Sequence, residues 1–181
     1  PLTADDFVYS LRRLMNPQTA ASLAYFMYML DNAEAVNQGK LPETDLGVYS
    51  QGPHTLVMQL AAPYPFLPER LLYPTAFPVP QHIINKVGAA WTKPEHWVSN
   101  GAYTLAHWQP EAFIEMHSNP HFVDSVSIQR ARYLPFANEQ AAYNRYRNGE
   151  LHAIASFPAN ELARVEKNHA ASLRQAPLLS M

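Results

Sequence analysis

Prolines constrain the fold of this chain more than any other residue type. The 181 residues include 16 prolines and only 6 glycines, and one group of prolines lies close together at positions 63, 65, 68, 74, 78 and 80. Because proline fixes one backbone dihedral and lacks an amide hydrogen, it interrupts helix interiors and central strands. We therefore expect short helices and repeated changes of direction in extended segments around residues 66–80.

A second irregular region runs from residue 91 to 105 and is rich in aromatic side chains. Pro94 prevents one helix from running through it, and Asn100-Gly101 is a strong turn signal. The segment predicts an ordered loop that enters a strand at Ala102. We expect a domain boundary in or near residues 82–98.

The N-terminal part predicts short helices and a hairpin. Thr3 can cap a helix that buries Phe7, Leu11, Leu14 and Met15 and that Pro17 ends. The apolar run over 20–30 favours a second, buried helix within 19–32. The remaining expected elements are a short helix over 33–38, a hairpin of 47–49 with 55–60, and helices over 66–73 and 81–87.

The C-terminal part alternates between strand and helix patterns. The expected elements are a hairpin of 102–108 with 112–117, a strand over 128–135, a helix over 138–148, a strand over 152–157, a helix from Pro158 that buries Leu162 and Val165, and a strand over 173–178. Alternation of this kind indicates an α/β fold with a mostly parallel sheet. The more irregular N-terminal part is closer to α+β.

Composition excludes several classes of function. The formal net charge is −2 and the basic residues are scattered, so we expect no nucleic-acid partner. The chain has no cysteine, which excludes disulfides and thiolate chemistry. Its first residues are polar and do not resemble an export signal, and no apolar stretch approaches the roughly 18–20 residues of a membrane span.

No catalytic or cofactor motif is present, so we expect no enzymatic activity and no cofactor. His117 and His121, with Glu115 as a third ligand, are the best metal candidates, but Pro120 keeps the histidines off one regular helical face. We expect solvent-exposed histidines and no metal site there, with a metal-dependent hydrolase as the weaker alternative. Glu69 and Arg70 are interpreted as surface charges of a short helix.

Several segments resemble, in order and at fitting spacing, the extracytoplasmic solute-binding proteins of oligopeptide and dipeptide ABC importers. They are Thr3-Ala-Asp-Asp-Phe-Val-Tyr-Ser10, Asn32-Ala-Glu-Ala followed by Gly39-Lys40, Asp45-Leu-Gly-Val48, Phe77-Pro-Val-Pro80, Trp91-Thr-Lys-Pro94, Ser99-Asn-Gly-Ala-Tyr103, Asn119-Pro120, and Asn144-Arg-Tyr-Arg followed by Gly149-Glu150. Each segment alone is a weak signal. Their series covers nearly the whole chain.

The resemblance implies a partial periplasmic-binding-protein type II-like lobe together with the extra subdomain of peptide-binding proteins. Residues 1–82 would belong to the extra subdomain and 83–181 to part of the first ligand-binding lobe. The second lobe would be absent, so we expect a fragment that binds its solute weakly alone.

The resemblance also implies which residues line the ligand cleft. These are Leu23, Tyr25, Tyr73, Ala155, Ser156 and Phe157. The family's pattern often has Tyr at the position of Leu23, His at Tyr73, and Tyr-Asn at Ala155-Ser156, so the solute could differ from an ordinary peptide. An ordinary role as core or rim residues is the alternative for all six.

The implied partners are a peptide or peptide-like small solute and, for the full-length parent, an ABC permease. The implied location is periplasmic or otherwise extracytoplasmic. An alternative function is an interaction module derived from such a protein, which would self-associate through exposed sheet edges.

Overall fold

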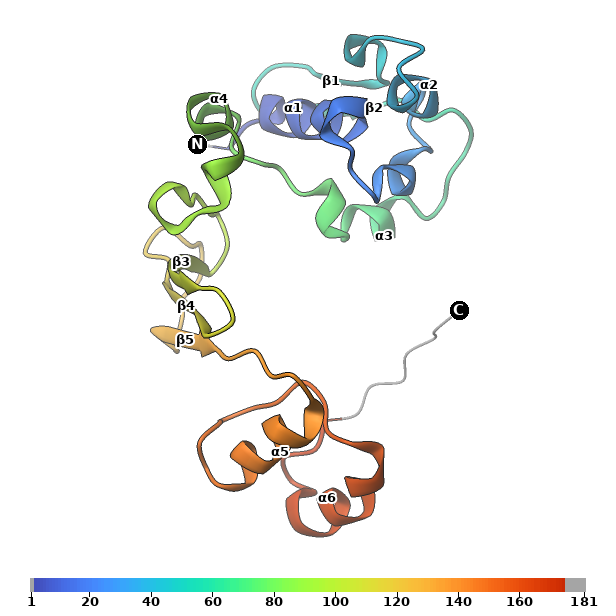
Figure 1. Ribbon diagram of the computed structural model, residues 1–181. Helices are drawn as coiled ribbons and strands as arrows, with labels where there is room; N and C mark the ends of the chain where they lie inside the picture. Colours follow the sequence, from blue (N-terminus) through green and yellow to red (C-terminus); the bar gives the residue numbers. More distant parts are fainter. Residues whose placement is uncertain (1, 175–181) are drawn as a thin grey trace. The chain divides into compact units, whose positions relative to one another are not determined.

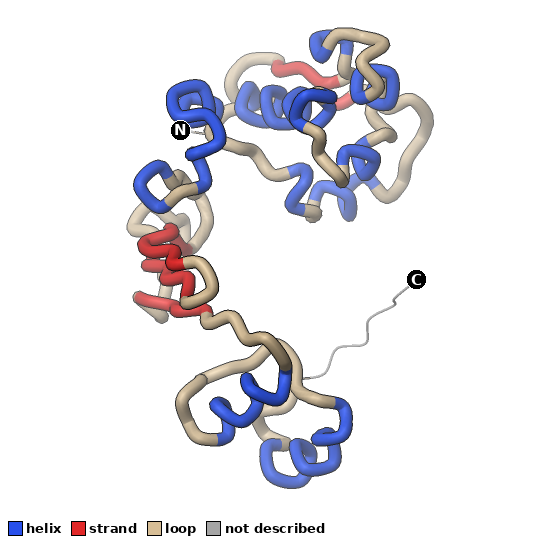
Figure 2. Tube along the Cα trace, in the orientation of Figure 1, coloured by secondary structure: helices blue, strands red, loops and turns tan. Residues whose placement is uncertain are grey.

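The computed structural model describes residues 2–174, which form two compact units that divide between Val98 and Ser99 (Figure 1). Each unit contains both helices and strands, as Figure 2 shows by colour. None of the helices in residues 2–174 has the length and apolar character that a membrane span requires. A division at residue 82 between two subdomains of the family stays a prediction.

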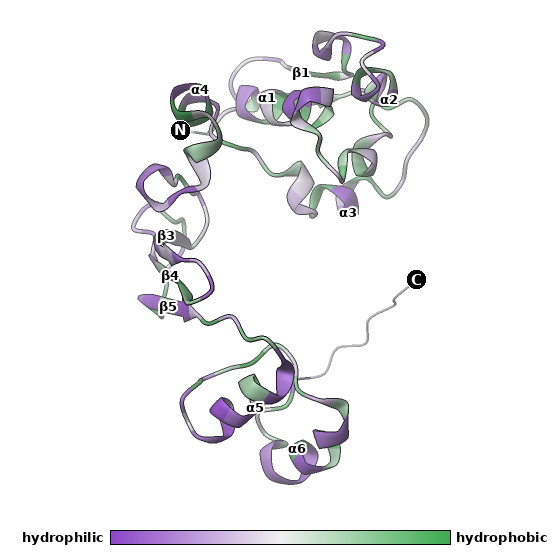
Figure 3. Cartoon of the chain, viewed as in Figure 1, coloured by the Kyte–Doolittle hydropathy of each residue, from purple (hydrophilic) through white to green (hydrophobic). Residues whose placement is uncertain are grey.

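The first unit is built around helix α1 (Ala4–Met15). The backbone N–H of Thr3 donates to Asp6 Oδ2 at 2.8 Å, which fixes the start of the helix as the sequence predicts. Leu11 and Met15 are buried, and Val8 takes the buried position expected for Phe7. Both hydrophilic and hydrophobic residues colour α1 in Figure 3, as expected for an amphipathic helix.

The prediction of a second helix over 19–32 is wrong. The segment contains two short 3-10 turns, Pro17–Thr19 and Ala24–Met27, with Ala20 between them in the left-handed region at φ 49°. Several backbone groups after these turns bond to a distant segment. The N–H of Asp31 donates to Gln59 O at 2.9 Å, and the N–H of Ala61 donates to Met29 O at 3.0 Å. Tertiary pairing therefore overrides helix propensity here.

The other elements of the first unit are short, as the prolines predict. They are α2 (Ala33–Asn37), the 3-10 turn Glu43–Asp45, β1 (Val48–Ser50), β2 (Leu56–Met58), α3 (Leu67–Leu71), the 3-10 turn Pro74–Ala76, α4 (Gln81–Val87), and the 3-10 turns Gly88–Thr92 and Pro94–His96. β1 and β2 pair antiparallel, which confirms the first predicted hairpin. Side chains from α1, α2, β1 and the turns between them form one hydrophobic core.

The second unit contains a three-stranded antiparallel sheet of order β3-β4-β5, formed by Tyr103–Gln109, Phe113–Ser118 and Arg130–Tyr133. Helix α5 (Glu139–Arg147) follows and begins as predicted, because Asn138 Oδ1 accepts a hydrogen bond from the N–H of Ala141 at 2.8 Å. After a 3-10 turn, Ala159–Glu161, helix α6 (Leu162–His169) ends the described secondary structure.

The predicted parallel sheet in this unit is wrong for the residues that the structure describes. β5 pairs antiparallel with β4, and residues 152–157 form no strand although their sequence has a strand pattern. Strand geometry needs a hydrogen-bonding neighbour, and residues 99–174 supply none for this segment. Most of the strand expected over 173–178 lies outside the described residues. On α6, Val165 is buried as predicted but Leu162 is exposed.

Asn119 holds the loop that enters β3. Its Nδ2 donates to the carbonyls of Ser99 at 3.1 Å and Gly101 at 2.8 Å, and its Oδ1 accepts from the N–H of His121 at 3.0 Å. Asn119 is buried, so these bonds satisfy an amide that would otherwise destabilise the fold. The structure thus confirms an ordered loop that leads into a strand near Ala102.

Candidate functional site

In the first unit, three of the predicted cleft residues lie on the surface near one another. Leu23, Tyr25 and Tyr73 have exposed fractions of 43%, 57% and 48%. Tyr25 and Tyr73 both pack against Phe26, with ring centroids 4.8 Å and 5.1 Å from the Phe26 ring. The 3-10 turn Ala24–Met27 supplies Tyr25 and Phe26, and Tyr73 directly precedes the turn Pro74–Ala76.

Sequence reasoning missed Phe26 and Arg70, which complete this surface. Arg70 lies on α3, and its guanidinium carbon is 4.8 Å from the Phe26 ring centroid. Its Nε donates to the hydroxyl of Tyr64 at 2.9 Å. We call Leu23, Tyr25, Phe26, Tyr64, Arg70 and Tyr73 the aromatic–arginine patch. The one signal for Arg70 in the sequence is its position as a basic residue within an apolar segment bounded by prolines.

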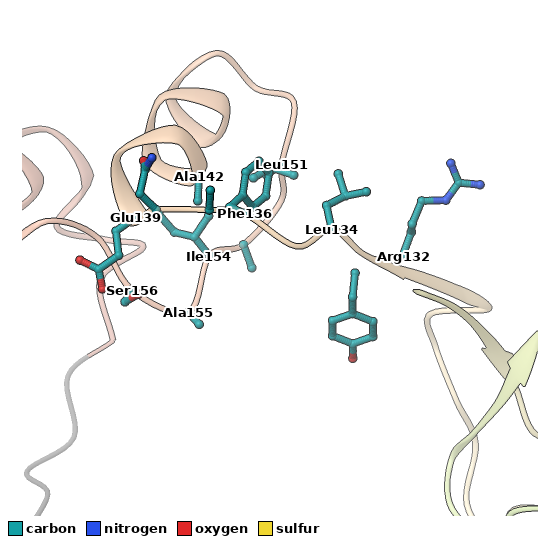
Figure 4. Close-up of a pocket in the computed structure, with 13 residues that line it drawn as sticks. Arg132, Leu134, Phe136, Glu139, Ala142, Leu151, Ile154, Ala155 and Ser156 are labelled. Atoms are coloured by element: carbon teal, nitrogen blue, oxygen red, sulfur yellow. The ribbon is translucent and has the colours of Figure 1, made fainter. Parts of the chain in front are cut away.

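In the second unit, Ala155 and Ser156 line an open hollow of about 460 Å³. Its walls are α5 and the segments before and after this helix, and most of its lining is apolar: Leu134, Phe136, Ala142, Leu151 and Ile154 (Figure 4). Arg132 lies at one end of the hollow, and Glu139 and Ser156 lie at the other. A largely apolar hollow with a few polar groups is typical of small-molecule sites.

Phe157, the sixth predicted residue, packs differently. Its ring lies 6.2 Å from that of Tyr143, and both residues line a second hollow of about 300 Å³ among α5, α6 and residues 152–157. Ala155 contacts both hollows. The structure therefore places Phe157 at the small core of this unit, whereas Ala155 and Ser156 face open space. A role of all six residues in ligand contact stays a prediction.

The Glu115 carboxylate, considered above as a metal ligand, binds two side chains of its own sheet. Glu115 is buried on β4, and its Oε2 accepts from Arg132 Nε at 2.9 Å while its Oε1 lies 3.0 Å from His117 Nε2. Arg132 also stacks over the Phe113 ring, with 4.5 Å between its guanidinium carbon and the centroid. Within residues 2–174, no three His, Asp or Glu side chains lie close enough together to hold a metal ion.

These contacts give the sheet a pH dependence. The hydrogen bonds from Arg132, then the bond from His117, lower the pKa of Glu115 from 4.5 to about 2, and the nearby charge of Arg130 acts in the same direction. Because the folded pKa lies below the unfolded one, the stabilisation is present above pH 4.5 and is lost as the pH falls toward 2.

We therefore expect acid to weaken protection of the β4 amides in the wild-type chain between pH 5 and pH 2. In Glu115→Gln the loss over this interval should be much smaller, because no carboxylate is present to take up the proton. Hydrogen–deuterium exchange of residues 113–118 at several pH values, corrected for intrinsic rates, measures this. Equal acid sensitivity in both chains would contradict the assigned role of Glu115.

Self-association through exposed surface also stays a prediction. Trp108, Ile114 and Tyr133 are paired across β3, β4 and β5 and are all exposed, so one face of this sheet carries an apolar row. Exposed apolar surface of this kind occurs at protein–protein contacts.

Comparison with known proteins identifies relatives along the whole chain. The family described as "Bacterial extracellular solute-binding proteins, family 5 Middle" matches residues 1–181. The "Probable deoxycholate-binding periplasmic protein YgiS" of Escherichia coli K12 is 38% identical over 99% of this chain and 34% of its own length. The "Periplasmic oligopeptide-binding protein OppA" of Salmonella typhimurium is 39% identical over 83% of this chain and 28% of its own length. The chain thus spans about a third of these relatives.

Solved structures of similar proteins have the same fold. The Escherichia coli murein tripeptide-binding protein MppA matches 93% of this chain and 34% of its own, with a TM-score of 0.88 and 34% identity. The Haemophilus influenzae OppA in complex with the peptide RPPGFSPFR matches 93% of this chain, with a TM-score of 0.89 and 33% identity. These matches confirm a mixed helix and strand fold of the periplasmic peptide-binding type over a partial chain.

Proposed function

Because this chain belongs to family 5 of the bacterial extracellular solute-binding proteins, we propose that it forms part of the solute-capturing component of an ABC importer. The observation that carries the proposal is the family match over residues 1–181. Relatives at 34–39% identity are periplasmic binding proteins, which supports an extracytoplasmic location. A permease would be the partner of the complete protein, and this chain would bind a solute without transforming it.

The proposed solute is a peptide or a peptide-like small molecule. The aromatic–arginine patch on the first unit and the 460 Å³ hollow on the second offer the exposed apolar surface and the few polar groups that such a ligand requires. In this proposal residues 1–82 are the extra subdomain and residues 83–181 are part of the first ligand-binding lobe. Ser156 and nearby backbone groups would bond to an extended peptide as to an added strand.

A steroid acid is a second candidate solute. One relative carries "deoxycholate-binding" in its name and is 38% identical over 99% of this chain. The predicted cleft positions are consistent with a less peptide-like ligand, since Leu23 and Ala155 carry no hydrogen-bonding side chain. With either solute, the chain would still form part of the solute-capturing component of an ABC importer.

An NMR titration of the ¹⁵N-labelled chain tests the proposed function. We expect the tripeptide Ala-Phe-Ala or sub-micellar deoxycholate to shift a limited set of amide signals in a saturable manner, whereas maltose at the same concentration shifts none. Binding should be weak, because this third of the relatives' length can bury only part of a solute's surface. If neither the tripeptide nor deoxycholate shifts any signal at millimolar concentration, the proposed function is wrong for this chain.

A further inference from the structure

Arg70 is held in place by neutral groups. The Tyr64 hydroxyl accepts from Nε at 2.9 Å, and the guanidinium carbon lies 4.8 Å from the Phe26 ring centroid. Together these contacts restrain the guanidinium plane, which leaves less conformational freedom to lose when a ligand binds. The hydrogen bond to Tyr64 is also the main reason that the pKa of Arg70 is raised above its ordinary value. Arg70 is therefore charged at every physiological pH.

The charge of Arg70 has no carboxylate partner among residues 2–174. The ion pairs in this part of the chain involve Arg132, Arg145, Arg164 and His117, and the neighbouring Glu69 does not reach Arg70. Surface arginines often lack a partner, so this observation alone identifies no site. It gains significance from the surroundings of Arg70.

Those surroundings are apolar and exposed. Phe26 lies under the guanidinium, and the rings of Tyr25 and Tyr73 pack against it with centroid distances of 4.8 Å and 5.1 Å. Leu23, which directly precedes the same turn, is exposed. A flat apolar body that covered these rings would displace water from the arginine. Removing water strengthens the attraction between the guanidinium and an anionic group.

We propose that Arg70 binds the carboxylate of an amphipathic solute, a steroid acid, whose rigid apolar body lies on Phe26, Tyr25 and Tyr73. The proposal rests on the proposed function and specifies the solute class for this part of the site. Charge complementarity supports the carboxylate. The flat rings support a rigid body without amides, because an extended peptide would bury many backbone N–H and C=O groups, whereas these three rings offer only the two hydroxyls of Tyr25 and Tyr73 as partners.

Arg70→Gln in the 181-residue chain tests the proposal, with Arg13→Gln on α1 as the matched control for loss of one arginine. Sub-micellar deoxycholate, its uncharged 24-amide and Ala-Phe-Ala are titrated by NMR against both variants and the wild type. We expect Arg70→Gln to weaken deoxycholate binding about tenfold, as the loss of a charged hydrogen bond requires. The 24-amide should bind the wild type and Arg70→Gln equally. Arg70→Lys should restore part of the affinity.

The outcomes separate this proposal from the general function. Equal affinity of deoxycholate for Arg70→Gln and Arg13→Gln overturns the role of Arg70 but leaves solute binding intact. The same holds if the wild type binds the uncharged 24-amide as tightly as it binds deoxycholate. A larger effect of Arg70→Gln on the tripeptide than on deoxycholate overturns the steroid acid as the solute. No shift with any of the three compounds counts against the proposed function itself. The dispersion of the NMR spectrum of each variant shows directly that it is folded.

Discussion

Leu11→Ala is expected to lower the stability of the first unit by about 2–5 kcal/mol. Leu11 is only 1% exposed and lies at the centre of α1, in the hydrophobic core that also contains Met15, Met27 and Val48. The shorter side chain would leave a cavity that the surrounding helix and strands can only partly fill. Hydrogen–deuterium exchange of the α1 amides measures the free energy of opening for this unit.

Leu72→Ala provides the matched control. Leu72 directly follows α3 and is 75% exposed, so the same chemical change should alter stability by less than about 0.5 kcal/mol. If both variants lose the same protection, Leu11 does not occupy the core of this unit. The core assignment would also be wrong if the loss in Leu11→Ala were confined to residues near the chain terminus.

Tyr143→Ala is expected to cost the second unit about 3–5 kcal/mol. Tyr143 is 1% exposed on α5, and its ring contacts Phe157 and lies under the guanidinium of Arg147. Apart from Val165, few large side chains of this unit are buried, so one truncation should remove much of its core. The measurement is the loss of amide protection in α5, at residues 139–147.

Tyr143→Phe, by contrast, should not destabilise the second unit. The Tyr143 hydroxyl is buried and has no hydrogen-bond partner among residues 2–174. An unpaired buried hydroxyl destabilises a fold, so its removal should leave protection of α5 unchanged or increase it. A loss of more than about 1 kcal/mol in Tyr143→Phe would show that the hydroxyl bonds to a group not found in the described residues.

Local signals in the sequence predict the elements of this fold well where a few neighbouring residues determine them. The bond from Asn138 fixes the start of α5, and the prolines around residue 68 limit the neighbouring helices to short ones. The run over 20–30 does not form the expected helix because its backbone pairs with residues near Leu60, a contact that no local pattern can indicate. The same limit explains the incorrect parallel sheet, since strand direction depends on neighbours far along the chain.

The candidate site, too, could be predicted from the sequence only in part. Family resemblance directed attention to Leu23, Tyr25 and Tyr73, and the structure places Tyr25 and Tyr73 against one ring. It could not identify Phe26 and Arg70, because their contact joins a turn and a helix that are distant in sequence. The sequence pattern predicts only a surface charge at Arg70, and its contacts with Tyr64 and Phe26 distinguish it from one.

The titration of the ¹⁵N-labelled chain, followed signal by signal, tests most directly whether this chain contributes a solute-binding surface. We predict that saturable shifts concentrate at Leu23, Tyr25, Tyr73 and residues 155–157, while the amides of the core helix α1 stay unchanged. Shifts that avoid all of these surface positions, or that spread evenly over both units, would contradict the account.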